Sequence, residues 1–233
     1  MKRYLSLATL FFFFVGLVAQ HDNLPQVKDP AAKEILDKLV EKSKTFKTVK
    51  AKFDFTLENE QEDINENYSG DVSFKGDNYR LSLMGVTTYC DGTTIWTHIV
   101  EAEEVNVSTR DPKDGSFMNN PQKIFSGYNE DFKYKLVGEK KSDSGTLVQI
   151  ELYPEQLEQG LLPDDENDID YSKILLTIDK MKYELISAKY FGQNGSNYLI
   201  KILDFNTNTL IDDASFKFNT ALHPDVEIID LRE

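Results

Sequence analysis

The side chains best suited to nucleophilic or metal chemistry lie far apart in this chain. His21 is near the start, His98 is in an alternating apolar segment, His223 precedes a proline near the end, and Cys90 is the only cysteine. The chain contains no HExxH, CxxC or GxSxG motif and no glycine-rich phosphate loop. These residues predict that the protein is not an enzyme and holds no cofactor.

The densest group of carboxylates lies in segment 163–170 (PDDENDID). Carboxylate oxygens are the ligands that Ca²⁺ prefers, but Ile169 stands after Asp168 where a calcium-binding EF-hand loop has a glycine. We therefore expect a solvated acidic loop between two strands, and no metal site.

The first twenty residues have the layout of a secretory signal peptide. Lys2 and Arg3 form a basic start, an apolar run follows at 5–18 (LSLATLFFFFVGLV), and Ala19 is a small residue suited to cleavage. The run is shorter than the roughly 20 residues that span a bilayer, which disfavours the alternative of a membrane anchor. We expect a cleaved signal over 1–20, a single domain over 21–233, and a periplasmic protein without a lipid anchor.

The charge balance is strongly acidic. Loss of Lys2 and Arg3 leaves 24 of the 26 basic residues against 40 acidic ones, a net charge of −16. Such a surface repels nucleic acid and anionic lipid headgroups. Nucleic-acid binding is therefore not expected.

One amphipathic helix is predicted after the leader, from Asp29 to about Phe46. Asp29 is a good N-cap, and Pro30 suits the first helical position. Four apolar residues then fall on one face, opposite lysines and glutamates. They are Ile35, Leu36, Leu39 and Val40.

From Val49 the apolar period changes to two, which predicts strands. The runs cover 49–57, 68–75, 79–84, 87–90, 94–100, 105–109, 132–138, 146–153, 172–179, 185–191 and 197–205, and two short apolar pieces, 216–218 and 226–231, close the chain. Turn residues such as Gly76 and Gly92 separate neighbouring runs. The pattern predicts an antiparallel meander of eleven or twelve strands.

The meander is interrupted by a short predicted helix after Asn120, which places Ile124, Phe125 and Tyr128 on one side. Many aromatic and aliphatic residues also gather on single faces of the strands. They fill an ordinary core on one interpretation. On the other, a sheet of a dozen strands that curls without closing keeps a concave face that helices cover, and that face forms a ligand cavity.

Several segments, in this order and spacing, resemble the periplasmic lipoprotein carrier family LolA in its Bacteroidetes-type form. They are DPAAKEILDK from Asp29, VKAKFDF from Val49, GDVSFKGDNYRL from Gly70, DGTTIW from Asp91, FKF from Phe216 and HPDVEIID from His223. The resemblance implies a mainly β (α+β) fold, an incomplete, half-open antiparallel β-barrel of about eleven strands with an α-helical lid. It also implies a monomer that takes acylated lipoproteins from an inner-membrane ABC transporter to an outer-membrane acceptor.

The resemblance also suggests where acyl chains bind. The expected cavity residues are Phe53, Phe55, Leu57, Tyr79, Leu81, Leu83, Trp96 and Tyr190, and the expected lid residues are Ile35, Leu36, Leu39, Val40, Ile124, Phe125 and Tyr128. One departure concerns the arginine that holds the lid closed in family members. Gly76 occupies the matching position, Lys75 is beside it, and Arg80 is expected on the opposite face.

Two other functions use the same fold. One is an envelope sensor of the RseB type, which uses a similar half-barrel to detect lipoproteins and usually carries a second domain. The other is a generic lipid carrier that differs only in its cargo. The sequence does not distinguish the cargo or the acceptor.

Overall fold

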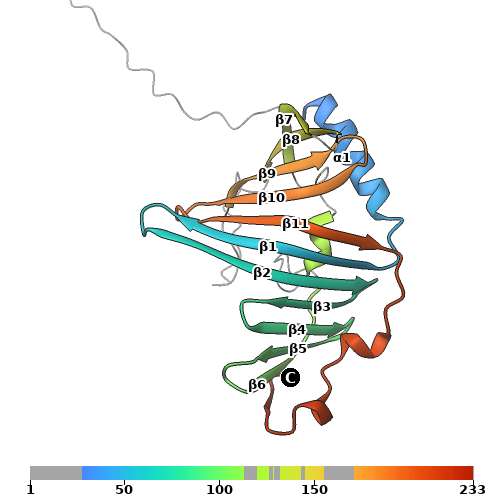
Figure 1. Ribbon diagram of the computed structural model, residues 1–233, viewed down its shortest axis with the longest axis vertical. Coiled ribbons are helices and arrows are strands. Elements are labelled where there is room, and N and C mark those ends of the chain that lie inside the picture. The colour runs from blue at the N-terminus through green and yellow to red at the C-terminus, as the bar shows by residue number, and fades with distance from the viewer. Residues whose placement is uncertain are drawn as a thin grey trace, which may run out of the picture.

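A computed structural model describes residues 28–112, 120–125, 128, 132–142, 145–154 and 171–232. The strands of this part form one sheet of twelve (Figure 1). They are β1 (Val49–Asn59), β2 (Ile64–Lys75), β3 (Asn78–Leu83), β4 (Val86–Asp91), β5 (Thr94–Ile99), β6 (Glu104–Thr109), β7 (Phe132–Ser142), β8 (Gly145–Pro154), β9 (Tyr171–Asp179), β10 (Glu184–Gly192), β11 (Asn197–Thr207) and β12 (Glu227–Asp230).

The sheet is open, with the order β12-β6-β5-β4-β3-β2-β1-β11-β10-β9-β8-β7. The expected mainly β, half-open architecture is therefore confirmed, with twelve strands in place of about eleven. Neighbouring strands pair antiparallel except at one edge, where β12 pairs parallel with β6. The antiparallel pairing of β1 with β11 joins the two halves of the meander.

The predicted helix is α1 (Pro30–Ser43), and its start is fixed by Asp29. One carboxylate oxygen of Asp29 accepts the Ala31 N–H at 2.9 Å, and the other accepts the Leu136 N–H of β7 at 3.1 Å. The Leu136 bond is the main reason why the pKa of Asp29 is lowered. The N-cap thus also joins the helix to the sheet. The helix ends three residues earlier than predicted, and Phe46 packs edge-on against Phe205.

Two predictions for the shorter elements need revision. The helix after Asn120 is a 3₁₀ helix, η1 (Pro121–Phe125). The piece 216–218 is not a strand, because 3₁₀ helix η3 (Asp213–Phe216) ends within it and η4 (Thr220–Leu222) follows. Phe216 and Phe218 are nevertheless buried, so their apolar spacing reflects packing of a non-strand segment against the sheet.

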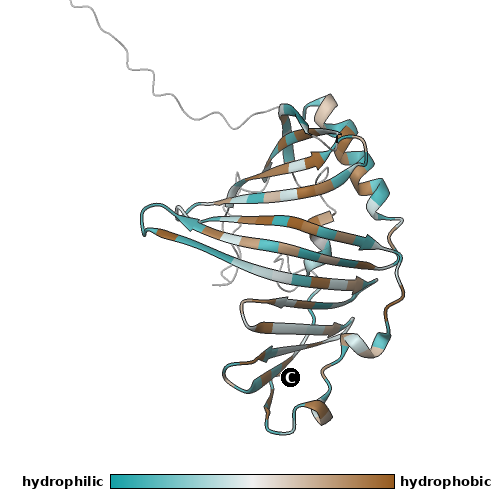
Figure 2. Ribbon diagram, viewed as in Figure 1, coloured by the Kyte–Doolittle hydropathy of each residue, from teal (hydrophilic) through white to brown (hydrophobic). Residues whose placement is uncertain are grey.

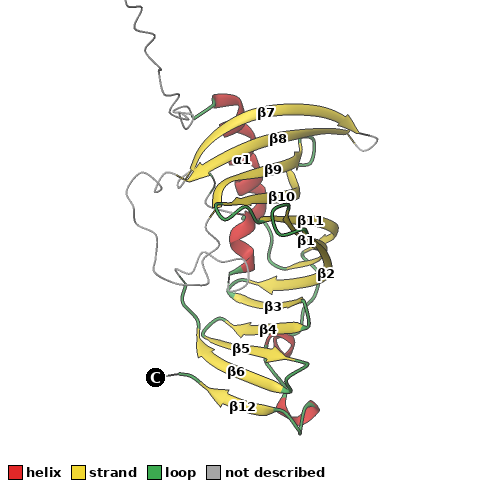
Figure 3. Ribbon diagram, turned by 90° about the vertical axis from the view of Figure 1, so that its left-hand side faces the viewer, coloured by secondary structure: helices red, strands yellow, loops and turns green. Residues whose placement is uncertain are grey.

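Alternation along the strands gives the sheet two faces (Figure 2). The inner face carries Leu81 and shares one apolar cluster with α1. The outer face carries Arg80 and is covered near β3 and β4 by η3. Figure 3 shows α1 running across the strands near the β7 end.

No helix among the described residues is long and apolar enough to cross a membrane. The predicted signal peptide, 1–20, lies outside the described residues.

Candidate ligand-binding face

The inner face is a continuous apolar surface because the pairing register aligns apolar residues across neighbouring strands. Val72 lies opposite Leu81 and Phe74 opposite Tyr79 in the β2–β3 pair. The same alignment continues through β11, β10, β9 and β8. Its buried members are Val49, Ala51, Phe53, Val72, Phe74, Tyr79, Leu81, Leu83, Cys90, Ile95, Val148, Ile150, Leu152, Ile174, Leu176, Ile178, Ala188 and Ile200.

One glycine makes room for a large aromatic side chain on this face. Gly70 lies opposite Phe53 in the β1–β2 pair, and a Cβ at Gly70 would come within 2.5 Å of the Phe53 ring. Phe53 therefore lies over the backbone of β2 and is only 2% exposed. The Gly70 position is a packing requirement, since any side chain there would displace the ring.

All seven predicted lid residues are buried in the same cluster as the inner face. They are Ile35, Leu36, Leu39 and Val40 of α1, with Ile124 and Phe125 of η1 and Tyr128, three residues beyond η1. The Phe125 ring lies between Phe74 at 6.1 Å and Phe205 at 5.6 Å. Helix α1 and η1 therefore cover the inner face with apolar contacts.

The polar bonds that hold this cover lie at its edges. Lys42 of α1 pairs with Glu184 of β10 at 2.7 Å, and each side chain is about a third exposed. The Ser43 hydroxyl donates to the Phe125 carbonyl at 3.1 Å and so joins α1 to η1. Partly exposed ion pairs contribute up to about 1 kcal/mol each. The cover is therefore held mainly by its apolar contacts.

The inner face is less covered toward the end of β1 that faces the β1–β2 turn. Phe55 and Leu57 of β1 are half-buried, as are Tyr198 of β11 and Tyr190 of β10. Phe55 and Tyr198 have ring centroids 6.1 Å apart. The register places Leu57 opposite Tyr198 and Tyr198 opposite Tyr190. We call these four residues the aromatic end of the inner face.

Trp96 is the one predicted cavity residue that the register places on the other face. It lies opposite Tyr89 and Val107, and it packs in a second apolar cluster with Val105 and Phe218. The sequence reads Thr-Ile-Trp-Thr, so Ile95 and Trp96 are both apolar and alternation alone does not decide between them. The pairing of Cys90 with Ile95 places Ile95 on the inner face.

The second cluster contains three rings in mutual contact on the outer face. Phe218 packs against His98, at a centroid distance of 5.2 Å, and stacks on His223, at 5.0 Å. The two imidazoles are also 4.9 Å apart. Burial, followed by the nearby His223, lowers the pKa of His98. The structure thus places His98 in a structural cluster, with its ring packed against the C-terminal segment.

Gly76, which stands where the resemblance would place an arginine, lies in a turn. Gly76 forms the β2–β3 turn with a φ of +57°, and Lys75 pairs with Asp213 at 2.7 Å. Arg80 lies on the outer face, as predicted, where it pairs with Asp71 at 3.0 Å.

A different arginine contacts the cover, and no motif in the sequence pointed to it. Arg110 is 8% exposed and follows β6. Its guanidinium pairs with Asp77 in the β2–β3 turn at 3.3 Å and donates to the Asn120 side-chain oxygen at 2.9 Å. Asn120 immediately precedes η1, so Arg110 fixes the start of that helix to the sheet.

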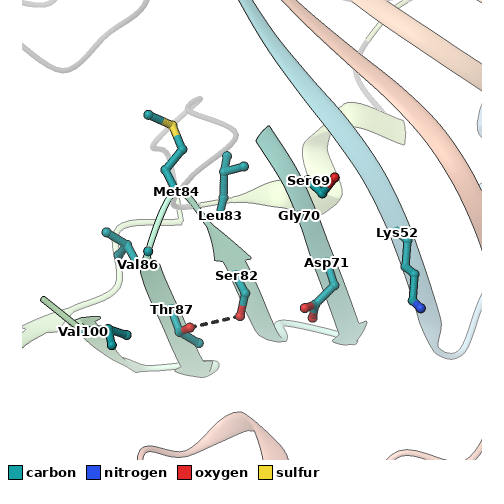
Figure 4. A pocket seen from close by; sticks show the side chains of 11 residues that line it. Lys52, Ser69, Gly70, Asp71, Ser82, Leu83, Met84, Val86, Thr87 and Val100 are labelled. Atoms are coloured by element: carbon teal, nitrogen blue, oxygen red, sulfur yellow. Dashed lines mark hydrogen bonds between the residues drawn. The ribbon is translucent and has the colours of Figure 1, made fainter. Parts of the chain in front are cut away.

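Two cavities lined by described residues open on the sheet. One, of about 330 Å³, lies where β2 extends beyond β3, and Figure 4 shows its lining. It brings the inner-face residue Leu83 next to the exposed Met84 and Val100, and to Lys52 and Asp71 of the outer face. The other, of about 880 Å³, lies between the outer face and the C-terminal segment. Neither is lined by residues of α1.

The remaining candidates for catalysis or metal binding are Cys90 and groups of carboxylates. Cys90 is fully buried on the inner face, and burial raises the pKa of its thiol, as expected for an inert cysteine. Among the described residues, no group of three or more His, Cys, Asp or Glu side chains is placed to hold a metal ion. The acidic segment 163–170 lies outside the described residues.

Comparison with known proteins supports the fold. No protein-family model and no curated protein matches the chain. Among solved structures, an uncharacterized conserved protein from Thermus thermophilus matches with a TM-score of 0.52 and 16% identity. That match covers 86% of this chain and 99% of the other, so the two share their overall architecture.

Weaker matches include a lipoprotein and a LolA superfamily protein. The lipoprotein LppX of Mycobacterium tuberculosis matches with a TM-score of 0.48 and 13% identity, over 79% of this chain and all of that one. The LolA superfamily protein NE2245 of Nitrosomonas europaea matches with a TM-score of 0.41 and 13% identity, over 80% of this chain and 97% of that one.

Proposed function

We propose that this protein is a periplasmic carrier of the LolA type, which binds the acyl chains of lipoproteins on its inner face. It would receive them from an inner-membrane ABC transporter and deliver them to an outer-membrane acceptor. The observation that carries this proposal is the continuous apolar inner face, covered by α1 and η1 through apolar contacts with polar bonds only at the edges.

The energies of the cover and of a single acyl chain are comparable. Burying one large aliphatic side chain contributes about 1.5–3 kcal/mol, so Ile35, Leu36, Leu39 and Val40 of α1 together contribute roughly 6–12 kcal/mol. An acyl chain of about 15 methylenes, at about 0.8 kcal/mol each, represents about 12 kcal/mol. An acyl chain that replaces α1 on the inner face therefore exchanges one apolar contact for a similar one. A nearly balanced exchange lets the cargo enter and leave without a large free-energy difference.

The aromatic end is the place where a chain would first contact the inner face. Phe55 and Leu57 are half-buried there, whereas Leu81 and Tyr79 are at most 1% exposed under the cover. A chain that enters along Phe55 and Tyr198 would then displace α1 and η1 progressively. The net charge of −16 expected after signal removal would limit adhesion to anionic membranes between the two steps.

The test is to identify what the protein carries in its native envelope. Mass spectrometry of ligands co-purified with the full-length protein should find triacylated lipopeptides. Free phospholipid alone would support a generic lipid carrier, and a stably bound membrane-protein partner without lipid would support an RseB-type sensor.

A variant pair tests the binding face directly. Phe55→Asp should greatly weaken binding of an acylated peptide, because it places a charge on the aromatic end. Thr56→Asp, the next residue of the same strand and on the outer face, should leave binding unchanged. A photocrosslinker at Phe55 should likewise capture acyl chains. Capture at Lys52 only would place the cargo on the outer face.

A further inference from the structure

One hydroxyl on the cover has no hydrogen-bond partner among the described residues. Tyr128, three residues beyond η1, is 3% exposed, and its phenol oxygen is buried. A buried donor without an acceptor is costly, and natural proteins retain few of them. A phenylalanine would fill the same space without that cost, so the hydroxyl is expected to serve a partner outside the protein.

Two other phenols lie near this hydroxyl. The Tyr171 and Tyr190 rings meet edge-on, with centroids 5.4 Å apart. Tyr190 is on the inner face beside Tyr198. A register shift between Phe191 and Gly192 skips one residue of β9 and lets Tyr171 pack on the inner-face cluster too. Burial raises the pKa of Tyr128 well above its ordinary value, and Tyr190 and Tyr171 raise it further.

These phenols can donate hydrogen bonds but offer little to a charged group. The Tyr128 and Tyr190 phenols stay protonated at neutral pH, since burial raises the pKa of both. The groups that act on the Tyr128 phenol are Tyr190 and Tyr171, which are themselves uncharged at neutral pH and supply no cation. A carboxylate buried here would lack a cationic partner and would lose its hydration. A carbonyl oxygen needs only a donor.

We propose that the Tyr128 hydroxyl, beside Tyr190, is a polar subsite for the carbonyl oxygen of an ester or amide at the head of an acyl chain. The subsite would make the inner face prefer neutral, ester- or amide-linked acyl chains over free fatty acids and plain hydrocarbons. This inference rests on the proposed function, because it assigns a chemical preference to the same binding face.

The test compares Tyr128→Phe with Tyr89→Phe, a matched change on the outer face, in the full-length protein. Binding of dioleoylglycerol, oleate at pH 8 and 1-octadecene is measured by displacement of a fluorescent hydrophobic dye. Wild type should bind dioleoylglycerol more tightly than oleate. Tyr128→Phe should weaken dioleoylglycerol binding about five- to tenfold, as expected for one lost hydrogen bond, and should leave octadecene binding unchanged. Tyr89→Phe should change neither.

Thermal unfolding of the empty protein gives an independent readout. Because Tyr128→Phe removes an unsatisfied buried hydroxyl, its midpoint should equal or exceed that of wild type. A variant with unchanged dioleoylglycerol affinity, or one that loses dioleoylglycerol and octadecene equally, would overturn the subsite while leaving the carrier proposal intact. A wild-type protein that binds none of the three probes would overturn both. Tyr190→Phe should show the same selective loss, of smaller size.

Discussion

Two apolar surfaces lie on opposite faces of the same sheet, and they are covered in different ways. The outer cluster around Trp96 and Phe218 is closed by the C-terminal segment, which continues into strand β12. Backbone hydrogen bonds fix that segment at both ends of β12, from Glu227 to Glu103 at 2.9 Å and from Leu231 to Val107 at 2.8 Å. The inner face is closed by α1 and η1, whose contacts with it are mainly side-chain contacts.

The difference shows which cover can move. Removing the outer cover would break the β12–β6 ladder and expose the rings around Phe218. When α1 moves away from the sheet, the hydrogen bonds within the helix stay intact, because its backbone N–H and C=O groups pair with each other. It breaks edge contacts such as Lys42–Glu184 and exposes apolar surface that a ligand can cover again. We therefore propose that the outer cluster serves structural integrity and that the inner face serves ligand exchange.

The largest effect is expected from a charge under the inner cover. Leu81 is 1% exposed, so Leu81→Asp buries an unpaired carboxylate and should cost about 5 kcal/mol or more, enough to unfold the protein. The same reasoning applies to Tyr79→Asp. Circular dichroism with chemical denaturation measures the loss, and Arg80→Ala, on the outer face, is the control. A folded Leu81→Asp variant of near wild-type stability would mean that water already fills this part of the inner face.

A somewhat smaller effect is expected on the outer face. Phe218→Ala removes the ring that packs against both His98 and His223 and should cost about 3 kcal/mol. Below its unfolding temperature the variant should still bind acylated peptide with wild-type affinity. Loss of affinity in the folded variant would show that the two faces are coupled. It would contradict the proposal that they have separate roles.

Arg110→Ala tests the bond that fixes η1. It removes the contacts with Asp77 and Asn120 and should cost about 1–2 kcal/mol. Because it loosens the cover and leaves the inner face intact, it should also speed uptake of a fluorescent acyl probe in stopped-flow measurements. Slower uptake would indicate that Arg110 helps to form the binding face itself.

The smallest effect is a pH dependence confined to the outer cluster. Because the pKa of His98 is lowered in the folded protein, the unfolded chain binds a proton more readily as the pH falls below about 6.5. The free energy of unfolding should therefore decrease from pH 7.5 to pH 5.5. His98→Gln should reduce this decrease, and an identical pH profile for the variant would show that other groups cause it.

The sequence predicted those features that depend on local pattern. Alternation found the strands, and Asp29 with Pro30 marked the start of α1. What it missed depends on pairing between distant segments. The β4–β5 register decides on which face of the sheet Trp96 lies. Arg110 meets Asp77 and Asn120 only in the folded chain, and apolar residues of 216–218 pack without forming a strand.

The central claim is that α1 must leave the inner face for acyl chains to bind there fully. In a Cys90→Ala background, Lys42→Cys with Glu184→Cys allows a short, reducible bis-maleimide to lock α1 to β10, since these side chains meet at 2.7 Å. Lys75→Cys with Asp213→Cys locks the outer cover at an ion pair of the same length. The inner lock should abolish binding of an acylated peptide, and reduction of the cross-link should restore it, whereas the outer lock should have no effect. Full binding with the inner lock in place would contradict the account.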